Sequence, residues 1–211
     1  MSEELIEKYR EFFLAFCERR GLDPQNPHLK DTPKRVVQSL LELTRGYKED
    51  PYAVLCKTFE TNHCTSSLCE DSSSTTLRLP HGLLVIHSGI SFTSICSHHL
   101  LPFYGYAYIG MILTSHLIGL SKVARVVEVL SQRLQVQEEL TAEIARVLSK
   151  VEGCSGVIVL MDGIHGCMCH RGVKQNSVTT TSVVTGRFLE DDKSVKEEFF
   201  SIISPLRKSL K

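Results

Sequence analysis

The chain has 211 residues, with 24 Lys plus Arg, 24 Asp plus Glu and no formal net charge when its nine histidines are neutral. That length suits one domain, or one domain with a helical arm. The balanced charge excludes a chain built to coat nucleic acid or anionic lipid. With 42% apolar and 23% charged residues, the composition is that of a globular protein and not of a disordered one.

No apolar run reaches the roughly 18 to 20 residues that a membrane span requires. The acidic start, MSEELIEKYR, also lacks the basic and then apolar pattern of a secretory signal. We therefore expect a cytoplasmic protein with no membrane or nucleic-acid partner. In that compartment the eight cysteines are expected to be thiols, some of them metal ligands, and not disulfides.

The first 50 residues are predicted to form a helical arm. Apolar residues recur at intervals of three and four over residues 3–20, which predicts an amphipathic helix. Its apolar face comprises Leu5, Ile6, Tyr9, Phe12, Phe13 and Phe16. Gly21 and two prolines end this pattern, and Asp31 followed by Pro33 predicts a second helix over residues 33–44.

Residues 51–211 are predicted to form the main domain. A segment rich in Ser and Thr, residues 61–76, reads as an exposed loop. Runs rich in β-branched and aromatic residues predict strands at 83–97, 103–113, 156–164 and 178–188. Apolar residues at helical spacing predict helices at 120–134 and 137–151, and a short helix at 197–206 closes the chain.

This order of elements favours an α+β domain whose antiparallel sheet is covered by a helix pair. Such a sheet would have open edges. Long open edge strands either aggregate or pair with copies of the same chain, so a closed oligomer built by sheet continuation is expected.

Two cysteine and histidine clusters could hold a metal ion. Cys96 and His99 are three residues apart on a predicted turn, a spacing that can satisfy two vertices of a tetrahedral zinc site. Cys167 or Cys169, from the run that starts at His165, could supply a third ligand. Water would then take the fourth vertex, as in a catalytic zinc site.

Two other interpretations of these clusters stay open at this point. Single cysteines in such a chain are often small core residues, so the clusters could be structural or accidental. A structural zinc could also be held by four thiolates, from Cys64, Cys69, Cys167 and Cys169.

Candidate anion-binding residues open the helix predicted at 120–134. Ser121, Lys122 and Arg125 lie in its first turn, where free backbone N–H groups and the helix dipole favour phosphate. Lys and Arg could equally form the solvated face of an amphipathic helix, and Arg35 and Arg171 allow the same interpretation.

Gln137 and Glu138 open the next predicted helix, where a carboxylate is stabilised by the helix dipole even without another role. Alternatively, the Glu138 carboxylate could accept two hydrogen bonds from a ring that carries adjacent N–H and NH2 donors. Guanine has that pattern and adenine does not.

Taken together, five stretches of the sequence resemble the GTP cyclohydrolase I family. They are DTPKRV from Asp31, CSHHLLPF from Cys96, IGLSK from Ile118 with Arg125, RLQVQE from Arg133, and HGCMCHRGV from His165. They follow one another in the family's order between residues 31 and 173.

The resemblance implies a role for individual residues. The implied metal ligands are Cys96, His99 and Cys167, and the implied catalytic residues are His98, His165 and Ser121. Gln137 and Glu138 match the guanine anchors, with Leu120 lining the pocket. Ser121, Lys122, Arg125 and Arg171 match the triphosphate binders, and Arg35 matches one that a neighbouring subunit supplies. Cys169 and His170 match no ligand.

The resemblance also implies a fold, an assembly and a reaction. The fold is the tunnelling fold, an antiparallel sheet backed by two long helices, and ten subunits form a toroid with active sites between them. The reaction uses zinc-activated water to open the guanine ring of GTP at C8. Formate leaves, the ribose is rearranged, and 7,8-dihydroneopterin triphosphate forms.

Two features depart from the family pattern. Ser97 stands where the family usually has an acidic residue, and residues 62–80 look like an insertion. The main alternative is a non-catalytic or regulatory paralogue that keeps the zinc site and the ring assembly. The retained histidines and cations weigh against it.

Overall fold

The computed structural model describes residues 2–56, 58–60, 82–189 and 194–209. These residues form two compact units, Met1–Arg45 and Gly46–Lys211. The Ser-rich stretch near 62–80, with Cys64 and Cys69, lies outside the described residues. No helix in the described ranges is both long and apolar enough to cross a membrane.

The first unit is a pair of helices, α1 (Ser2–Arg20) and α2 (Thr32–Leu43), packed against each other. Pro33 lies at the start of α2, as its fixed φ predicts. The expected apolar face of α1 is wrong in detail. Phe13 is buried together with Cys17, whereas Phe12 and Phe16 are 63% and 43% exposed. A single short partner helix covers only a narrow stripe of α1 within this unit.

The second unit is built on a five-stranded sheet in the order β5-β2-β3-β6-β7. The long strands are β2 (Leu83–Cys96), β3 (Pro102–Leu113), β6 (Cys154–His165) and β7 (Val178–Gly186). All of their pairings are antiparallel. The short β5 (Leu134–Gln135) runs parallel to the end of β2. Outside that contact, β2 and β7 are the edges of the sheet among the residues that the structure describes, in agreement with the expected open edges.

Helices α3 (Leu120–Ser131) and α4 (Gln137–Leu148) cover one face of the sheet. The apolar spacing that predicted them also gives their buried residues, among them Val123, Val127, Leu140 and Ile144. These side chains join inward residues of β3 and β6 in the main hydrophobic core. Burial of that core is the main driving force for this α+β fold.

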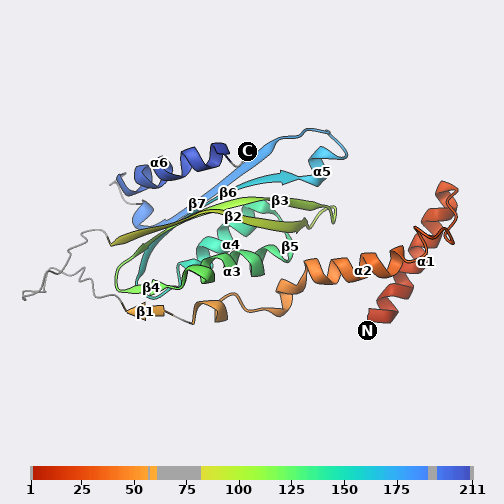
Figure 1. Ribbon diagram of the computed structural model, residues 1–211, viewed down its shortest axis with the longest axis horizontal. Coiled ribbons are helices and arrows are strands. Elements are labelled where there is room, and N and C mark those ends of the chain that lie inside the picture. Colours follow the sequence, from red (N-terminus) through yellow and green to blue (C-terminus); the bar gives the residue numbers. More distant parts are fainter. Residues whose placement is uncertain (1, 57, 61–81, 190–193, 210–211) are drawn as a thin grey trace, which may run out of the picture. The chain divides into compact units, whose positions relative to one another are not determined.

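The closing helix, α6 (Ser194–Ser209), lies on the other face of the sheet (Figure 1). Phe199 and Ile203 are fully buried there against a second apolar cluster that includes Tyr108 and Ile158. The sheet is therefore covered by helices on both faces, whereas the sequence predicted a helix pair on one.

The remaining elements are short. β1 (Thr58–Glu60) pairs with β4 (His116–Ile118) in a separate two-stranded sheet. Three 3-10 turns occur at Arg45–Lys48, Ala53–Leu55 and Arg187–Leu189, and α5 (Gly166–Cys169) is a single helical turn after β6. The strand expected over 178–188 ends at Gly186, which has a positive φ of 55°, and the chain then enters the last 3-10 turn.

Candidate functional site

A tight turn between β2 and β3 brings His99 back toward Cys96. The backbone N–H of Leu100 donates to the Cys96 carbonyl at 2.9 Å, and the N–H of Cys96 donates to the Leu101 carbonyl at 2.9 Å. Leu100 has the left-handed φ of 52°, which costs a non-glycine residue about 1 to 2 kcal/mol. This bend leaves the Cys96 Sγ 3.8 Å from the His99 Nδ1.

Cys167 reaches the same place from the end of β6. Phe103 pairs with His165 in the β3–β6 register, so α5 follows directly beside the β2–β3 turn. At Gly166 an added Cβ would lie 2.8 Å from the Pro102 carbonyl oxygen, so this close approach needs glycine. The ligand atoms of Cys96, His99 and Cys167 all lie within 4.8 Å of one another.

This donor set fits a tetrahedral metal ion. Two thiolates and one imidazole are ligands that zinc prefers, and the usual bond lengths place S and N ligand atoms about 3.6 Å apart. The measured 3.8 Å between Cys96 and His99 is close to that value. Cys169 is directed elsewhere, with its Sγ 3.6 Å from the Asn176 Oδ1, and His170 is exposed. Of the two candidates for the third ligand, Cys167 is therefore the one that lies beside Cys96 and His99.

The surroundings of Cys167 favour its protonated thiol. Burial raises its pKa, and the neighbouring Cys96 raises it further. Arg171 opposes this with its positive charge, which lowers the pKa of Cys167. The guanidinium of Arg171 therefore acts on the candidate metal group, although its side chain is exposed.

A cavity of about 290 Å³ opens beside this group. Its lining is drawn from the β2–β3 turn, the start of α4 and the end of β6, and comprises Cys96, His98, Phe103, Gln135, Val136, Gln137, Glu138, His165, Cys167, Met168 and Thr179. Two of the three candidate metal ligands, both candidate catalytic histidines and both candidate guanine anchors thus share one cavity. His98 and Glu138 are exposed, while Gln137 and Phe103 are buried.

His165 is held rigidly within this cavity. Its ring stacks on Phe103, with centroids 4.8 Å apart and planes inclined by 3°. Its Nε2 is 2.8 Å from the Gln137 Oε1. Burial lowers the pKa of His165, and the carboxylate of Glu138 partly opposes this shift. The ring is therefore a weaker base than a free imidazole.

The candidate triphosphate binders on α3 do not line this cavity. Leu120, Ser121 and Arg125 are exposed and Lys122 is half-buried in the first turn of α3, which follows the extended Gly119. The other end of α3 leads to β5, which pairs with Cys96. A helix of 12 residues is about 18 Å long, so within one chain these residues lie about a helix length from the metal group.

Arg35 belongs to the first unit, where it is exposed and its Nη2 lies 3.5 Å from the Asp31 Oδ2. Ser97 is exposed, and its backbone N–H donates to the Gln135 carbonyl at 3.0 Å.

The sequence analysis missed the residues that support the cavity from behind. Phe103 stacks on His165. The Thr181 hydroxyl and the Thr179 backbone carbonyl accept from the amide of Gln137, and the Thr141 hydroxyl lies 2.6 Å from that of Thr181. The run of threonines in the strand predicted at 178–188 was the available signal, since inward-facing threonines in a strand need hydrogen-bond partners.

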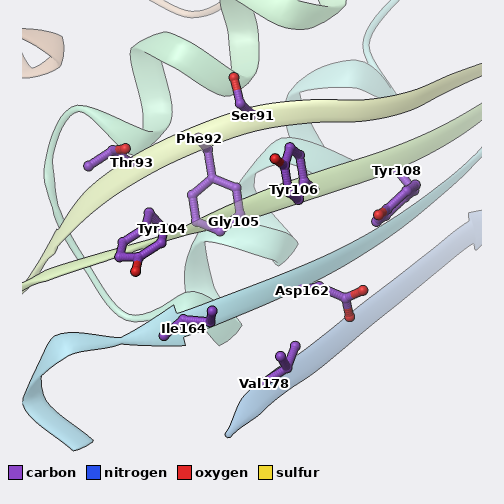
Figure 2. A pocket seen from close by; sticks show the side chains of 10 residues that line it. All are labelled: Ser91, Phe92, Thr93, Tyr104, Gly105, Tyr106, Tyr108, Asp162, Ile164 and Val178. Atoms are coloured by element: carbon purple, nitrogen blue, oxygen red, sulfur yellow. The ribbon is translucent and has the colours of Figure 1, made fainter. Parts of the chain in front are cut away.

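A larger cavity, of about 370 Å³, lies on the opposite face of the sheet (Figure 2). It is lined by Tyr104, Tyr106 and Tyr108 of β3 and by Asp162 of β6, among others. None of the predicted site residues lines it.

Comparisons with known proteins give a family. The family model described as GTP cyclohydrolase I matches residues 9–204. The GTP cyclohydrolase 1 of Porphyromonas gingivalis is 38% identical over 207 residues, covering 98% of this chain and 97% of the relative. That of Chlorobium phaeovibrioides is 39% identical over 206 residues, covering 97% and 84%. That of Hyperthermus butylicus is 38% identical over 189 residues, covering 90% and 86%.

A solved structure, the apo form of the archaeosine synthase QueF-Like, covers 52% of this chain and 97% of that chain with a TM-score of 0.40 and 12% identity. This likeness is too distant to assign the fold.

Proposed function

The chain belongs to the GTP cyclohydrolase I family of enzymes, and we propose that it converts GTP and water to formate and 7,8-dihydroneopterin triphosphate with a bound zinc ion. The observation that carries this proposal is the convergence of Cys96, His99 and Cys167 beside a cavity that also holds His98, His165 and Glu138. A second candidate function, a non-catalytic paralogue, has no observation of its own in its favour.

Cys96, His99 and Cys167 would hold the zinc ion. Three protein ligands leave one coordination position for water, which distinguishes a catalytic from a structural site. Zinc in such a site supplies a nucleophile at neutral pH by lowering the pKa of water. The thiol of Cys167, whose pKa burial raises, would release its proton when the ion binds, so zinc affinity should rise with pH.

The guanine base would be anchored by Glu138. Its exposed carboxylate at the start of α4 can accept hydrogen bonds from N1–H and the 2-amino group, which together distinguish guanine from adenine. The triphosphate would bind Ser121, Lys122, Arg125 and Arg171, with Arg35 of a neighbouring subunit and Leu120 against the base. Such multiple contacts hold the reacting carbon in register.

His165 and His98 would move protons. His165 would protonate a nitrogen of the guanine five-membered ring, which makes C8 electrophilic, and His98 would shuttle protons as C8 leaves as formate. Ser121 would donate a proton during rearrangement of the ribose. The overall reaction consumes one water, and the carbon lost from the base appears as formate.

We further propose the tunnelling fold and a ring of ten subunits, by resemblance to the family. Two observations support an assembly of this kind. Within the described ranges β2 and β7 have open edges, and the first turn of α3 is separated from the metal group within one chain. A neighbouring copy would then bring Lys122 and Arg125 to the cavity, and a monomer would be inactive.

The metal is tested by two matched cysteine variants. Cys167→Ser should lose bound zinc and the release of formate from GTP together. Its zinc affinity should fall by more than the roughly 10- to 100-fold expected for a residue that only hydrogen-bonds to a metal ligand. Cys169→Ser should keep both, because its thiol contacts Asn176 and not the metal group. Formate and the fluorescent pterin formed after oxidation report the reaction, and bound zinc is measured separately.

Equal losses in the two variants would show that the ligand assignment is wrong. If the unaltered protein binds zinc and assembles but releases no formate from GTP, the non-catalytic alternative replaces the proposed function.

The shared site is tested by mixing two inactive variants, Cys167→Ser and Arg125→Ala. If each site takes its metal group and its α3 residues from different copies, random reassembly restores about a quarter of the sites. If one chain supplies both groups, the mixture stays as inactive as its components.

A further inference from the structure

The side chain of Gln137 is 1% exposed, and all of its polar atoms are used inside the protein. Its Nε2 lies 3.2 Å from the Met161 carbonyl, 3.0 Å from the Thr179 carbonyl and 3.1 Å from the Thr181 hydroxyl. Its Oε1 lies 2.8 Å from the His165 Nε2. A base entering the cavity would have to break one of these bonds to reach the amide.

The surroundings fix which way the amide points. The carbonyl oxygens of Met161 and Thr179 can only accept hydrogen bonds, so they must face the NH2 group of Gln137. Turning the amide over would place three oxygen atoms together in a buried site without a proton between them. The Oε1 of Gln137 must therefore face His165.

The neighbouring threonines reinforce this orientation. The Thr141 hydroxyl donates to the backbone carbonyl of Gln137 at 2.7 Å, which uses its only proton. The Thr181 hydroxyl, 2.6 Å from that of Thr141, must then donate to it and accept from the Gln137 Nε2. The two N–H bonds of the Gln137 amide are shared among three acceptors, and the hydroxyl protons of Thr141 and Thr181 each have one direction, so the network holds the amide in one orientation.

Gly163 leaves the space that the amide occupies. A Cβ at this position would lie 2.2 Å from the Gln137 Oε1 and 3.6 Å from the His165 Nε2. Phe103 holds the imidazole plane by stacking. The ring of His165 is thus fixed in its plane by Phe103 and in its rotation by Gln137.

We propose that Gln137 is a positioning residue for His165 and not a guanine anchor. Its Oε1 accepts the Nε2–H of His165, so Nδ1 is the ring atom through which His165 exchanges a proton with bound substrate. This inference rests on the proposed function for the role of His165, and it replaces the guanine contact that the family resemblance implied for Gln137.

The test compares Gln137→Leu and Thr181→Val with Thr181→Ser. Thr181 does not line the cavity, so a change there reaches His165 only through Gln137. We expect kcat for zinc-loaded protein to fall on the order of 100-fold in Gln137→Leu and several-fold in Thr181→Val, the range of a misplaced proton-transfer group. KM for GTP should stay within about twofold, and Thr181→Ser should restore kcat.

A matched control is Thr185→Val, on the same strand and the same face. Its hydroxyl bonds the Val157 N–H and lies 3.3 Å from the Ser149 hydroxyl, away from Gln137. This variant should lose stability and keep kcat.

A second readout does not need turnover. Solid-state 15N spectra of histidine-labelled protein should show the neutral His165 with its proton on Nε2, and a mixture of both tautomers in Thr181→Val. A rise in KM with kcat unchanged in both test variants would restore the anchor role and overturn the proposal. The proposal would also be overturned if the tautomer of His165 were the same in Thr181→Val as in the unaltered protein. If the unaltered protein releases no formate, the proposed function fails, while the tautomer still decides the positioning role.

Discussion

The buried ion pair between Asp162 and Arg207 fastens the end of α6 to the sheet, and its two halves should respond unequally to substitution. The Nε and Nη2 of Arg207 lie 2.9 and 2.7 Å from the two carboxylate oxygens of Asp162, and the Thr180 hydroxyl donates to the same carboxylate at 2.6 Å. The Asp162 side chain is 7% exposed, whereas that of Arg207 is 23% exposed. Only the arginine can turn into water if its partner is lost.

The magnitudes follow from this difference in exposure. Arg207→Met leaves the Asp162 carboxylate buried without its guanidinium partner, and it removes the guanidinium 5.9 Å above the Tyr108 ring. Loss of one partner of a buried pair costs about 3 to 5 kcal/mol, and we expect about 3 because Thr180 remains. In Asp162→Asn the guanidinium of Arg207 can be hydrated. The free energy of unfolding should then fall by the amount typical of a partly exposed ion pair, about 1 kcal/mol.

Amide hydrogen exchange along α6 measures both effects directly, because opening of this peripheral helix exposes the pair to water. Exchange should accelerate roughly 150-fold in Arg207→Met and roughly 5-fold in Asp162→Asn. Lys208→Met, which alters an exposed neighbouring cation, is the control and should change little. Equal acceleration in the two pair variants would refute the argument from unequal exposure.

Two further changes should have defined effects. The His87 Nε2 is buried without a hydrogen-bond partner among the described residues, and burial lowers the pKa of His87 below its ordinary 6.5. As the pH falls below 6.5, His87 takes up a proton in the unfolded chain but not in the folded protein, so the free energy of unfolding decreases. His87→Leu should therefore reduce the fall in the urea midpoint between about pH 7.5 and 5.5. An unchanged pH dependence would show that His87 does not cause this loss of stability. At Gly110 a Cβ would lie 2.7 Å from Ile158 and 2.8 Å from Phe199, so Gly110→Ala should cost about 1 to 3 kcal/mol and speed exchange in α6. A gain in stability would show that Phe199 can move aside.

The parts of the fold that the sequence predicted are those with a strong local pattern. Val123, Val127, Leu140 and Ile144 follow helical spacing and are all buried on α3 and α4. The candidate metal group was also within reach of the sequence, because Cys96 and His99 are only three residues apart on one turn. Spacing alone left Cys167 and Cys169 as alternatives, and only the family resemblance favoured Cys167. The physical reason is how α5 continues from the β3–β6 register, which spacing does not give.

The parts that the sequence did not predict depend on contacts between distant segments. The apolar residues of α6 have helical spacing, but spacing does not tell which face of a sheet the helix covers. Gln137 is polar and opens a helix, and the family resemblance implied that it contacts guanine. It is buried because Gly163, 26 positions further along the chain, lacks a Cβ at the point where the amide enters.

The strands β6 and β7 carry two polar networks back to back. Alternation along β6 directs Gly163 and His165 toward α4, and Asp162, which precedes Gly163, toward α6. On β7 the same alternation assigns Thr181 to Gln137 and Thr180 to Asp162. Because the backbone pairing of β6 with β7 holds both networks in register, we expect Arg207→Met to loosen α6 without changing kcat. A fall in kcat in that variant would mean that the whole of β7 moves when α6 loosens. The packing of α6 on one face of the sheet would then determine the geometry of His165 on the other face.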